Sequence, residues 1–242
     1  MLFKYVSNRW IDSLICKNEI RFTQFTALND PFESSVLMQL DEPATDDEYE
    51  KMLPSVANIR RYLEKPSTQG RMTAEYFSSI YGILSLSRNV HNMLMWAHYG
   101  ESHTGFAIGF DEQHEFFKES GDNDFEPALK KVVYSKNRVV QTHDEELIFC
   151  HKSIDWAYEE EERLFKLLDL GGANGKHCQF NEPVYLFKIP KEAYKSIYIG
   201  ANMPKGEAKK LILACETHLP HVDVYTAEVS DEKYELVFNP QT

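Results

Sequence analysis

The sequence predicts an α+β fold: a central, mostly antiparallel sheet with flanking helices and a helical insertion. Short apolar segments that suit strands are mixed with amphipathic segments, without the regular alternation that builds a doubly wound sheet. No stretch follows the glycine-rich fingerprint of dinucleotide folds or the P-loop pattern. A chain of 242 residues is long enough for one sizeable core, so we expect a single domain over residues 1–242.

The first part of the chain alternates helical and extended segments. Residues 8–17 suit a short amphipathic helix, and residues 19–25 suit a strand in which apolar and polar side chains alternate. A turn is expected at residues 29–31, because proline fixes its own φ and keeps the preceding residue out of helical space.

Residues 41–82 differ in character and predict a helical insertion, either packed on the side of the core or acting as a lid. An acidic segment opens it, and helices are expected at about 47–64 and 73–81. Thr45 or Asp46 suits the capping position of the first helix, and Pro54 should kink or split that helix.

The remaining elements are predicted from apolar runs, glycines and helical periodicity. Strands are expected at residues 82–87, 105–110, 129–135, 184–189, 196–199, 222–227 and 234–238. Helices are expected at residues 93–99, 112–119, 142–153 and 204–217, the last with Leu211, Leu213 and Ala214 facing inward. Residues 158–167 suit either a strand or a helix.

Charge and composition narrow the class of protein. A formal net charge of -12 argues against broad nucleic-acid binding, although it leaves room for one local basic site. No apolar run is long enough for a membrane span, and the first residues lack the features of a signal peptide. The four cysteines are scattered without metal-ligand spacing. We therefore expect a cytoplasmic protein with no membrane contact and no metal site.

Four short clusters place aromatic rings and ionisable groups beside apolar runs, at residues 28–33, 84–87, 95–105 and 156–163. A core needs the apolar runs but not these polar edges, so the clusters predict one polar, aromatic-walled pocket. In the first cluster Asn29, Asp30 and Glu33 suit either a turn or a pocket edge. In the second, Ser87 suits either a turn at the end of a strand or a side chain that enters the pocket.

The third cluster combines two aromatic residues with two histidines. Trp96 and Tyr99 are three residues apart and share one face of a short helix, which suits either core anchors or pocket walls. His98 and His103 flank a glycine and suit a proton donor or a contact to a phosphate or amide. The alternative is that each histidine is an ordinary polar group.

The fourth cluster gives the clearest indication of a site, because Tyr158, Glu159, Glu161 and Arg163 stand beside an apolar run. In a strand Glu159, Glu161 and Arg163 share one face, whereas in a helix Glu159 pairs with Arg163. A carboxylate beside Arg163 should have a lowered pKa and stay ionised, which suits a catalytic or ribose-binding group. A solvated acidic helix is the alternative, and Glu159 and Glu161 are equal candidates.

In this order the clusters resemble a bacterial family catalogued as domain of unknown function 2971. The matching motifs are Lys4-Tyr5, the Asn-Asp-Pro-Phe-Glu of residues 29–33, the Met-Trp-x-His-Tyr of residues 95–99, His-x-Gly at 103–105 and Trp-x-Tyr-Glu-x-Glu-x-Arg at 156–163. The resemblance covers most of the chain, adds Tyr5 to the expected pocket and supplies no activity.

A weaker resemblance is to the start of ADP-ribosyltransferase-like folds, in which a strand with a tyrosine, a short helix and a second strand follow one another. Those folds place an early His or Arg, a middle Tyr or Ser and a late Glu around the nicotinamide riboside of NAD. Here Lys4-Tyr5 stands at the early position, Ser87 at the middle one and Glu159 or Glu161 at the late one. The resemblance implies NAD as a substrate, and it is at the level of fold only.

Three kinds of function remain. The first is an NAD- or nucleotide-using transferase or glycohydrolase in phage defence or toxin action, with Glu161 or Glu159 stabilising an oxocarbenium ion or binding ribose and His98 relaying a proton. The second is a non-catalytic module that senses a nucleotide or a partner protein. The third is a metal-dependent nuclease whose carboxylates would come from Asp30, Glu33, Glu159 and Glu161.

Overall fold

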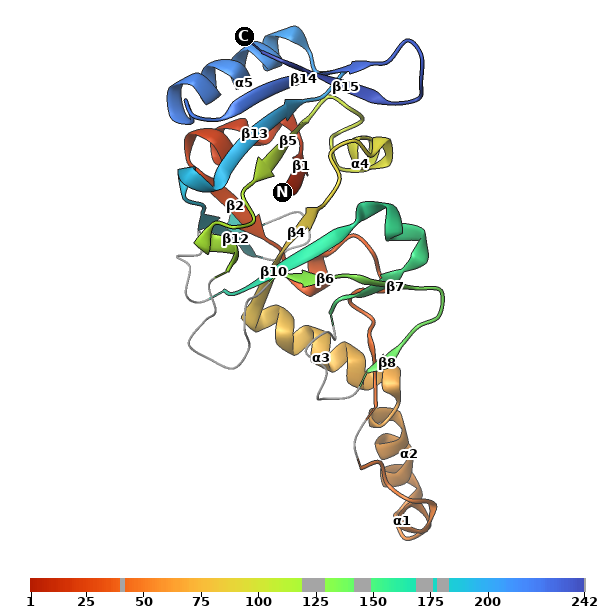
Figure 1. Ribbon diagram of the computed structural model, residues 1–242. Helices are drawn as coiled ribbons and strands as arrows, with labels where there is room; N and C mark the ends of the chain where they lie inside the picture. Colours follow the sequence, from red (N-terminus) through yellow and green to blue (C-terminus); the bar gives the residue numbers. More distant parts are fainter. Residues whose placement is uncertain (40–41, 119–128, 142–148, 169–175, 178–182, 242) are drawn as a thin grey trace.

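The main sheet of the protein has eight strands in the order β15-β14-β13-β5-β1-β4-β10-β6 (Figure 1). These are β1 (Leu2–Val6), β4 (Tyr81–Ser87), β5 (Phe106–Phe110), β6 (Lys130–Lys131), β10 (Glu161–Leu167), β13 (Tyr194–Ile199), β14 (Asp223–Val229) and β15 (Leu236–Pro240). Every neighbouring pair is antiparallel except β13 and β14. The computed structural model describes all residues except 40–41, 119–128, 142–148, 169–175, 178–182 and 242. The predicted α+β fold with a mostly antiparallel sheet is confirmed.

Three smaller sheets surround the main one. β2 (Glu19–Phe22), β11 (Lys176–His177) and β12 (Pro183–Lys188) form an antiparallel sheet in the order β11-β12-β2. β3 (Leu37–Met38) pairs in parallel with β8 (Val140–Gln141), and β7 (Val133–Ser135) pairs in parallel with β9 (His151–Ser153). The β7–β9 pair brings Lys152 close to β10, which matters for the site below.

Short helical turns and one long helix flank the sheets. They are η1 (Asn8–Trp10), η2 (Asp12–Cys16), η3 (Phe25–Ala27), α4 (Met93–His98), η4 (Glu115–Phe117), η5 (Ile154–Glu159), η6 (Lys191–Ala193) and α5 (Lys205–His218). α5 buries Leu211 and Cys215 against the core, so the inward positions are four residues apart. The expectation that Leu213 faces inward is wrong, because this side chain is 62% exposed.

The two faces of the main sheet carry different side chains. On one face Leu84, Leu86 and Leu164 enter the largest hydrophobic cluster. On the other face Phe3 packs in a cluster with Trp96, and Phe165 packs in a separate cluster with Ile83 and Phe25. Polar residues of β4 and β10 lie on this second face between the two clusters, and they form the candidate site.

The insertion contains three helices: α1 (Asp46–Glu50), α2 (Pro54–Leu63) and α3 (Pro66–Ile80). Thr45 caps α1 by accepting a hydrogen bond from the backbone N–H of Glu48, and Pro54 begins α2, so the predicted helix is split. α3 packs on the body, whereas α1 and α2, here called the arm, extend away from it (Figure 1). No described residue of the insertion before β4 lines the cavity described below, so the lid alternative gains no support.

We expect the arm to contribute little to the stability of the body. α2 buries only Ala57 and α1 buries no residue, while the backbone N–H of Ala44 lies 3.3 Å from the Glu64 carboxylate and closes the base of the arm. Replacing residues 45–63 with a short Gly-Ser linker should change the free energy of unfolding by less than about 1 kcal/mol, which is roughly 2–4 °C in melting temperature. Calorimetry checks this, with Ala74→Arg on the buried face of α3 as a destabilising control. A loss of more than about 10 °C on arm removal would show that the arm supports the body.

Several elements differ from the sequence-based expectations. The predicted helix at residues 142–153 lies partly outside the described residues, and at His151–Ser153 it is wrong, because this segment is strand β9. The predicted helix at 112–119 is reduced to the turn of η4. The single strand expected at 129–135 is divided, because β6 pairs with β10 while β7 pairs with β9. Residues 161–167 are a strand, which resolves the strand-or-helix ambiguity.

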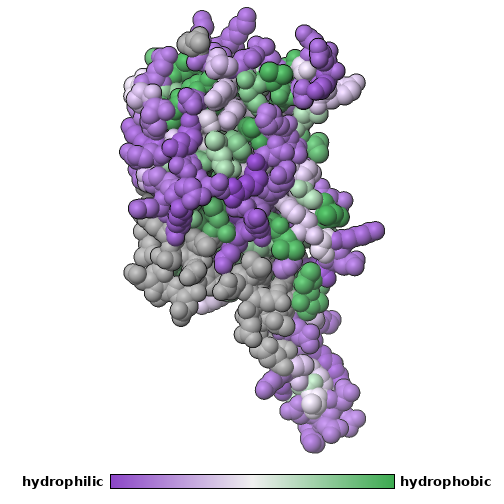
Figure 2. All heavy atoms as spheres, in the orientation of Figure 1, coloured by the Kyte–Doolittle hydropathy of each residue, from purple (hydrophilic) through white to green (hydrophobic). Residues whose placement is uncertain are grey.

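Hydrophilic residues cover much of the face seen in Figure 2, and the chain has a formal net charge of -12. Among the described residues no helix is long and apolar enough to span a membrane.

Candidate functional site

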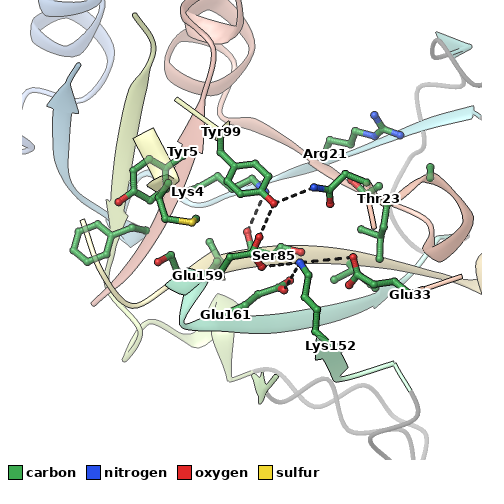
Figure 3. A pocket seen from close by; sticks show the side chains of 18 residues that line it. Lys4, Tyr5, Arg21, Thr23, Glu33, Ser85, Tyr99, Lys152, Glu159 and Glu161 are labelled. Atoms are coloured by element: carbon green, nitrogen blue, oxygen red, sulfur yellow. Dashed lines mark hydrogen bonds and ion pairs between the residues drawn. The ribbon is translucent and has the colours of Figure 1, made fainter. Parts of the chain in front are cut away.

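A cavity of about 340 Å³ opens on the second face of the main sheet, beside the polar residues of β4 and β10 (Figure 3). Residues of β1, β4 and β10 line it, together with residues from the 27–33 segment, α4 and β9. Its volume is at the lower end of the range of small-molecule sites, roughly 300–1,000 Å³.

Strand register explains why polar groups gather here. Glu161 of β10 lies opposite Ser87 of β4, and Arg163 lies opposite Ser85. Side chains of a strand alternate between faces, so these four residues share one face of the sheet. Phe3 of β1 pairs with Ser87 and extends the same face.

Lys152 lies at the centre of a buried carboxylate cluster, which consists of Glu33, Glu159 and Glu161. Its Nζ is 2.6 Å from Glu159 Oε2, 3.4 Å from Glu161 Oε2 and 3.7 Å from Glu33 Oε2. All four residues are at least nine-tenths buried. Burial disfavours the Lys152 ammonium, but the three carboxylates outweigh it and raise the pKa of Lys152.

Arg163 supports the carboxylate cluster from beneath. Its Nε lies 2.8 Å from Glu161 Oε1 and its Nη2 lies 3.0 Å from Glu161 Oε2, a bidentate pair. Nη2 also bonds Glu33, and Nη1 donates to the Phe149 carbonyl oxygen at 2.5 Å. Arg163 is 1% exposed and does not line the cavity, so it holds the cluster in place rather than contacting a ligand.

The two glutamates of the fourth sequence cluster have pKa values shifted in opposite directions. Burial opposes ionisation of Glu161, but Arg163, Lys152 and the Ser85 hydroxyl outweigh it and lower its pKa to about 2. Burial raises the pKa of Glu159 above its ordinary value, and the contacts with Lys152 and Tyr99 only partly offset this. A pair of carboxyl groups whose pKa values are pushed apart is typical of acid–base sites. Glu161 therefore stays ionised, and Glu159 is the group better suited to exchange a proton.

A short chain of hydrogen bonds positions Glu159. Asn29 Nδ2 donates to the Tyr99 hydroxyl at 3.0 Å, and this hydroxyl donates to Glu159 Oε1 at 2.5 Å. Burial and the nearby Glu159 raise the pKa of Tyr99, so its hydroxyl stays protonated and remains a donor. The Asn-Asp-Pro-Phe-Glu segment and α4 thus both fix the carboxyl group of Glu159.

Tyr99→Phe should raise the pKa of Glu159, because the carboxylate form loses a hydrogen-bond donor. The measurement is an NMR titration of the Glu159 side-chain carbonyl carbon in wild type and variant. Tyr158→Phe is the matched control, because the Tyr158 hydroxyl contacts His98 Nδ1 at 2.8 Å rather than Glu159. An unchanged or lowered Glu159 midpoint in Tyr99→Phe would mean that the hydroxyl does not stabilise the carboxylate.

The structure brings part of the predicted site together. The predicted residues that line the cavity are Tyr5, Asn29, Glu33, Ser87, Tyr99, Glu159 and Glu161. Asp30 does not line it, since its Oδ1 accepts a hydrogen bond from the Phe32 N–H at 2.9 Å and stabilises the turn. Trp96 is fully buried in the core, where its Nε1 donates to the Val90 carbonyl oxygen at 2.8 Å.

The remaining predicted residues lie outside the cavity. His98 is exposed and contacts Tyr158, so these two residues form a surface pair rather than part of the pocket wall. His103 stacks on Trp96 and lines a separate hollow beside residues 229–236. Arg163 lies beneath the cavity, as described above. Six of the predicted site residues therefore do not line the cavity, namely Asp30, Trp96, His98, His103, Tyr158 and Arg163.

Sequence reasoning missed five polar residues that line the cavity, namely Lys4, Arg21, Thr23, Ser85 and Lys152. Lys4 stands in the Lys4-Tyr5 motif, which could have indicated it. Lys152 fell inside the helix predicted at residues 142–153, and a three-residue strand is too short to show its own periodicity.

The carboxylates assigned to a metal by the nuclease alternative have other partners. Glu33, Glu159 and Glu161 bind Lys152 and Arg163. In the part of the chain that the structure describes, no group of three or more His, Cys, Asp and Glu residues could hold a metal ion.

The fold and the site define a mixed α+β protein with a charged pocket on its main sheet. Residues 95–164 match the family described as "Protein of unknown function (DUF2971)", which supports the resemblance seen in the motifs. The matched segment includes Tyr99, Lys152, Glu159, Glu161 and Arg163. No curated protein and no solved structure matches the chain. The likeness to ADP-ribosyltransferase-like folds stays a prediction.

Proposed function

We propose that the protein is an enzyme that breaks the bond between the base and ribose C1′ of NAD or another nucleotide, with Glu159 as the reactive carboxyl group. The observation that supports this most is the pair of carboxyl groups at one cavity with opposite pKa shifts: Glu161 ionised, and Glu159 with a raised pKa. Ribosyl transfer and hydrolysis pass through an oxocarbenium-like state, which a fixed negative charge stabilises.

The two carboxyl groups would have different tasks. The bond between C1′ and the base nitrogen breaks, and its electron pair leaves with the base. Nicotinamide leaves NAD as a neutral group and needs no proton, so Glu159 as a carboxylate accepts the proton of the incoming water or acceptor hydroxyl, whose oxygen bonds to C1′. The purine of ATP or GTP leaves as an anion, and the proton that Glu159 accepts would then pass to that base. Glu161 has both oxygens bound to Arg163 and contributes fixed negative charge rather than a reacting atom.

The position of His98 argues against the proton-relay role that the sequence predicted for it. His98 lies outside the cavity and has no part in the proposed reaction.

Phage defence or toxin action would be the setting of such an enzyme, because removal of NAD or nucleotides stops the metabolism of a cell. An ADP-ribosyl acceptor and plain hydrolysis remain alternative second halves of the same reaction.

A non-catalytic binding module is the second candidate. The observation that favours it is that each carboxylate of the cluster is ion-paired with Lys152 or Arg163, as in a rigid pocket that only binds. The pocket would then bind a nucleotide without cleaving it. Nucleotide binding would change the surface around the pocket, and a partner protein would bind to one form of that surface.

Incubation of the pure protein with NAD, ATP and GTP, followed by chromatography of the released bases, tests the proposal. Base release that is lost in Glu159→Gln and kept in Glu160→Gln supports it; Glu160 is the matched control because it is exposed and does not line the cavity. Binding by calorimetry without base release from any nucleotide would favour the sensing module. Cleavage of labelled DNA or RNA that requires magnesium would favour the nuclease.

A further inference from the structure

Lys4 lines the cavity with an ammonium group whose hydrogen-bonding capacity is only partly used. Its Nζ donates to the Ser85 carbonyl oxygen at 3.0 Å, whereas an ammonium group has three donors. Among the described residues it forms no ion pair, in contrast to Lys152 with its three carboxylates. A partly buried ammonium that lines a cavity with unused donors suits an anionic ligand.

The distribution of charge around the cavity supports this. Lys152 and Arg163 bind all three carboxylates of the cluster, and Lys4 lines the same cavity without an ion pair to any of them among the described residues. In the view of Figure 3, Lys4 and Arg21 lie on one side of Glu159 and Glu161, and Lys152 lies on the other. The cavity lining therefore sets three cations, Lys4, Arg21 and Lys152, against three carboxylates, in a chain with a formal net charge of -12.

The titration of Lys4 is consistent with an anion site. Burial lowers its pKa from 10.5 to about 8; Glu161 opposes this shift, and repulsion from Arg21 adds to it. Near pH 7 the side chain is still mostly charged, and a bound anion would favour the charged form further.

We propose that Lys4 binds a phosphate group of the ligand, so that the site takes a nucleotide in preference to the corresponding nucleoside. The inference rests on the proposed function for the ribosyl part of the ligand, which would reach Glu159 and Tyr99. Lys4 is the residue that distinguishes phosphorylated from unphosphorylated compounds. Lysine serves as a point charge for phosphate in many sites.

Calorimetry at pH 7 with two matched ligand pairs tests the inference: AMP against adenosine, and nicotinamide mononucleotide against nicotinamide riboside. We expect wild type to bind each phosphorylated compound at least tenfold tighter than its partner. Lys4→Met should weaken binding of the phosphorylated compounds and so reduce this ratio below about threefold. Lys188→Met is the control, because Lys188 is exposed and does not line the cavity.

The pH dependence gives a second measurement. Protonated Lys4 is required, so nucleotide affinity should fall roughly fivefold between pH 8 and pH 9, as the charged fraction of a group with a pKa of about 8 drops from half to about a tenth. Nucleoside affinity should stay constant over the same range. In wild type, inorganic phosphate should also raise the titration midpoint of the Lys4 side chain, which NMR can follow. This measurement uses the wild-type protein alone, so it does not depend on whether Lys4→Met folds.

The outcomes separate this inference from the proposed function. A phosphate preference that depends on Lys4, without base release, supports the inference and overturns the enzyme proposal. Base release with equal binding of nucleotides and nucleosides supports the enzyme proposal and overturns the inference. A phosphate preference that persists in Lys4→Met, or a Lys4 midpoint that phosphate does not move, also overturns it.

Discussion

Arg163→Met should destabilise the protein by about 3–5 kcal/mol, the cost of removing one partner of a buried ion pair. Arg163 is 1% exposed and bonds both Glu161 and Glu33, which are themselves buried. Methionine has a similar length but no charge, so both carboxylates lose a cationic partner while the packing is largely kept. Urea unfolding followed by circular dichroism measures the loss.

Two further variants test whether the loss of stability comes from the buried ion pairs of Arg163. Arg163→Lys keeps a positive charge but loses the bidentate geometry, so its stability should fall between wild type and Arg163→Met. Arg60→Met removes a partly exposed arginine that pairs with Glu64 at the end of the arm, and its effect should be small. If Arg163→Met unfolds at the same urea concentration as Arg60→Met, the buried network does not support the fold.

The kinds of element could largely be predicted from the sequence, because they depend on local patterns. Alternation of Ile20 and Phe22 with polar residues marks β2, and Pro54 marks the break between α1 and α2. The strand order could not be predicted in this way. The parallel pairing of β13 with β14 and the short strand β9 are set by contacts between segments distant in sequence, which leave no local periodicity.

Strand alternation predicted one part of the candidate site. Glu161 and Arg163 are two residues apart in β10, and this spacing predicted that they share one face of the sheet. The ion pair of Arg163 with Glu33 joins residues 130 positions apart, so no spacing rule could indicate it. Aromatic residues beside polar groups were misleading at Trp96, because a tryptophan that fills a core has the same sequence context as one that lines a pocket.

Glu161→Gln and Glu159→Gln should differ in their effects on stability. Glu161→Gln removes the anion that binds both Arg163 and Lys152, so we expect a loss of about 3 kcal/mol in stability at neutral pH. Glu159 has a raised pKa, so its ionised form is disfavoured in the folded state, and a neutral glutamine should change stability little. Under the proposed function, Glu159→Gln abolishes base release instead.

The pH dependence of stability checks the assignment of Glu161 without any substrate. Its pKa is lowered from 4.5 to about 2, so its contribution is present above pH 4.5 and is lost as the pH falls towards 2. A shift of this size corresponds to about 3 kcal/mol. Urea unfolding between pH 2 and pH 7 should therefore show a flatter limb below pH 4.5 for Glu161→Gln than for wild type. Glu159→Gln should keep the wild-type slope below pH 4.5, because a carboxyl group with a raised pKa is protonated there in both the folded and the unfolded state. Equal acid limbs in all three proteins would mean that the pKa of Glu161 is not lowered by folding, and a flatter limb in Glu159→Gln alone would exchange the roles of the two glutamates.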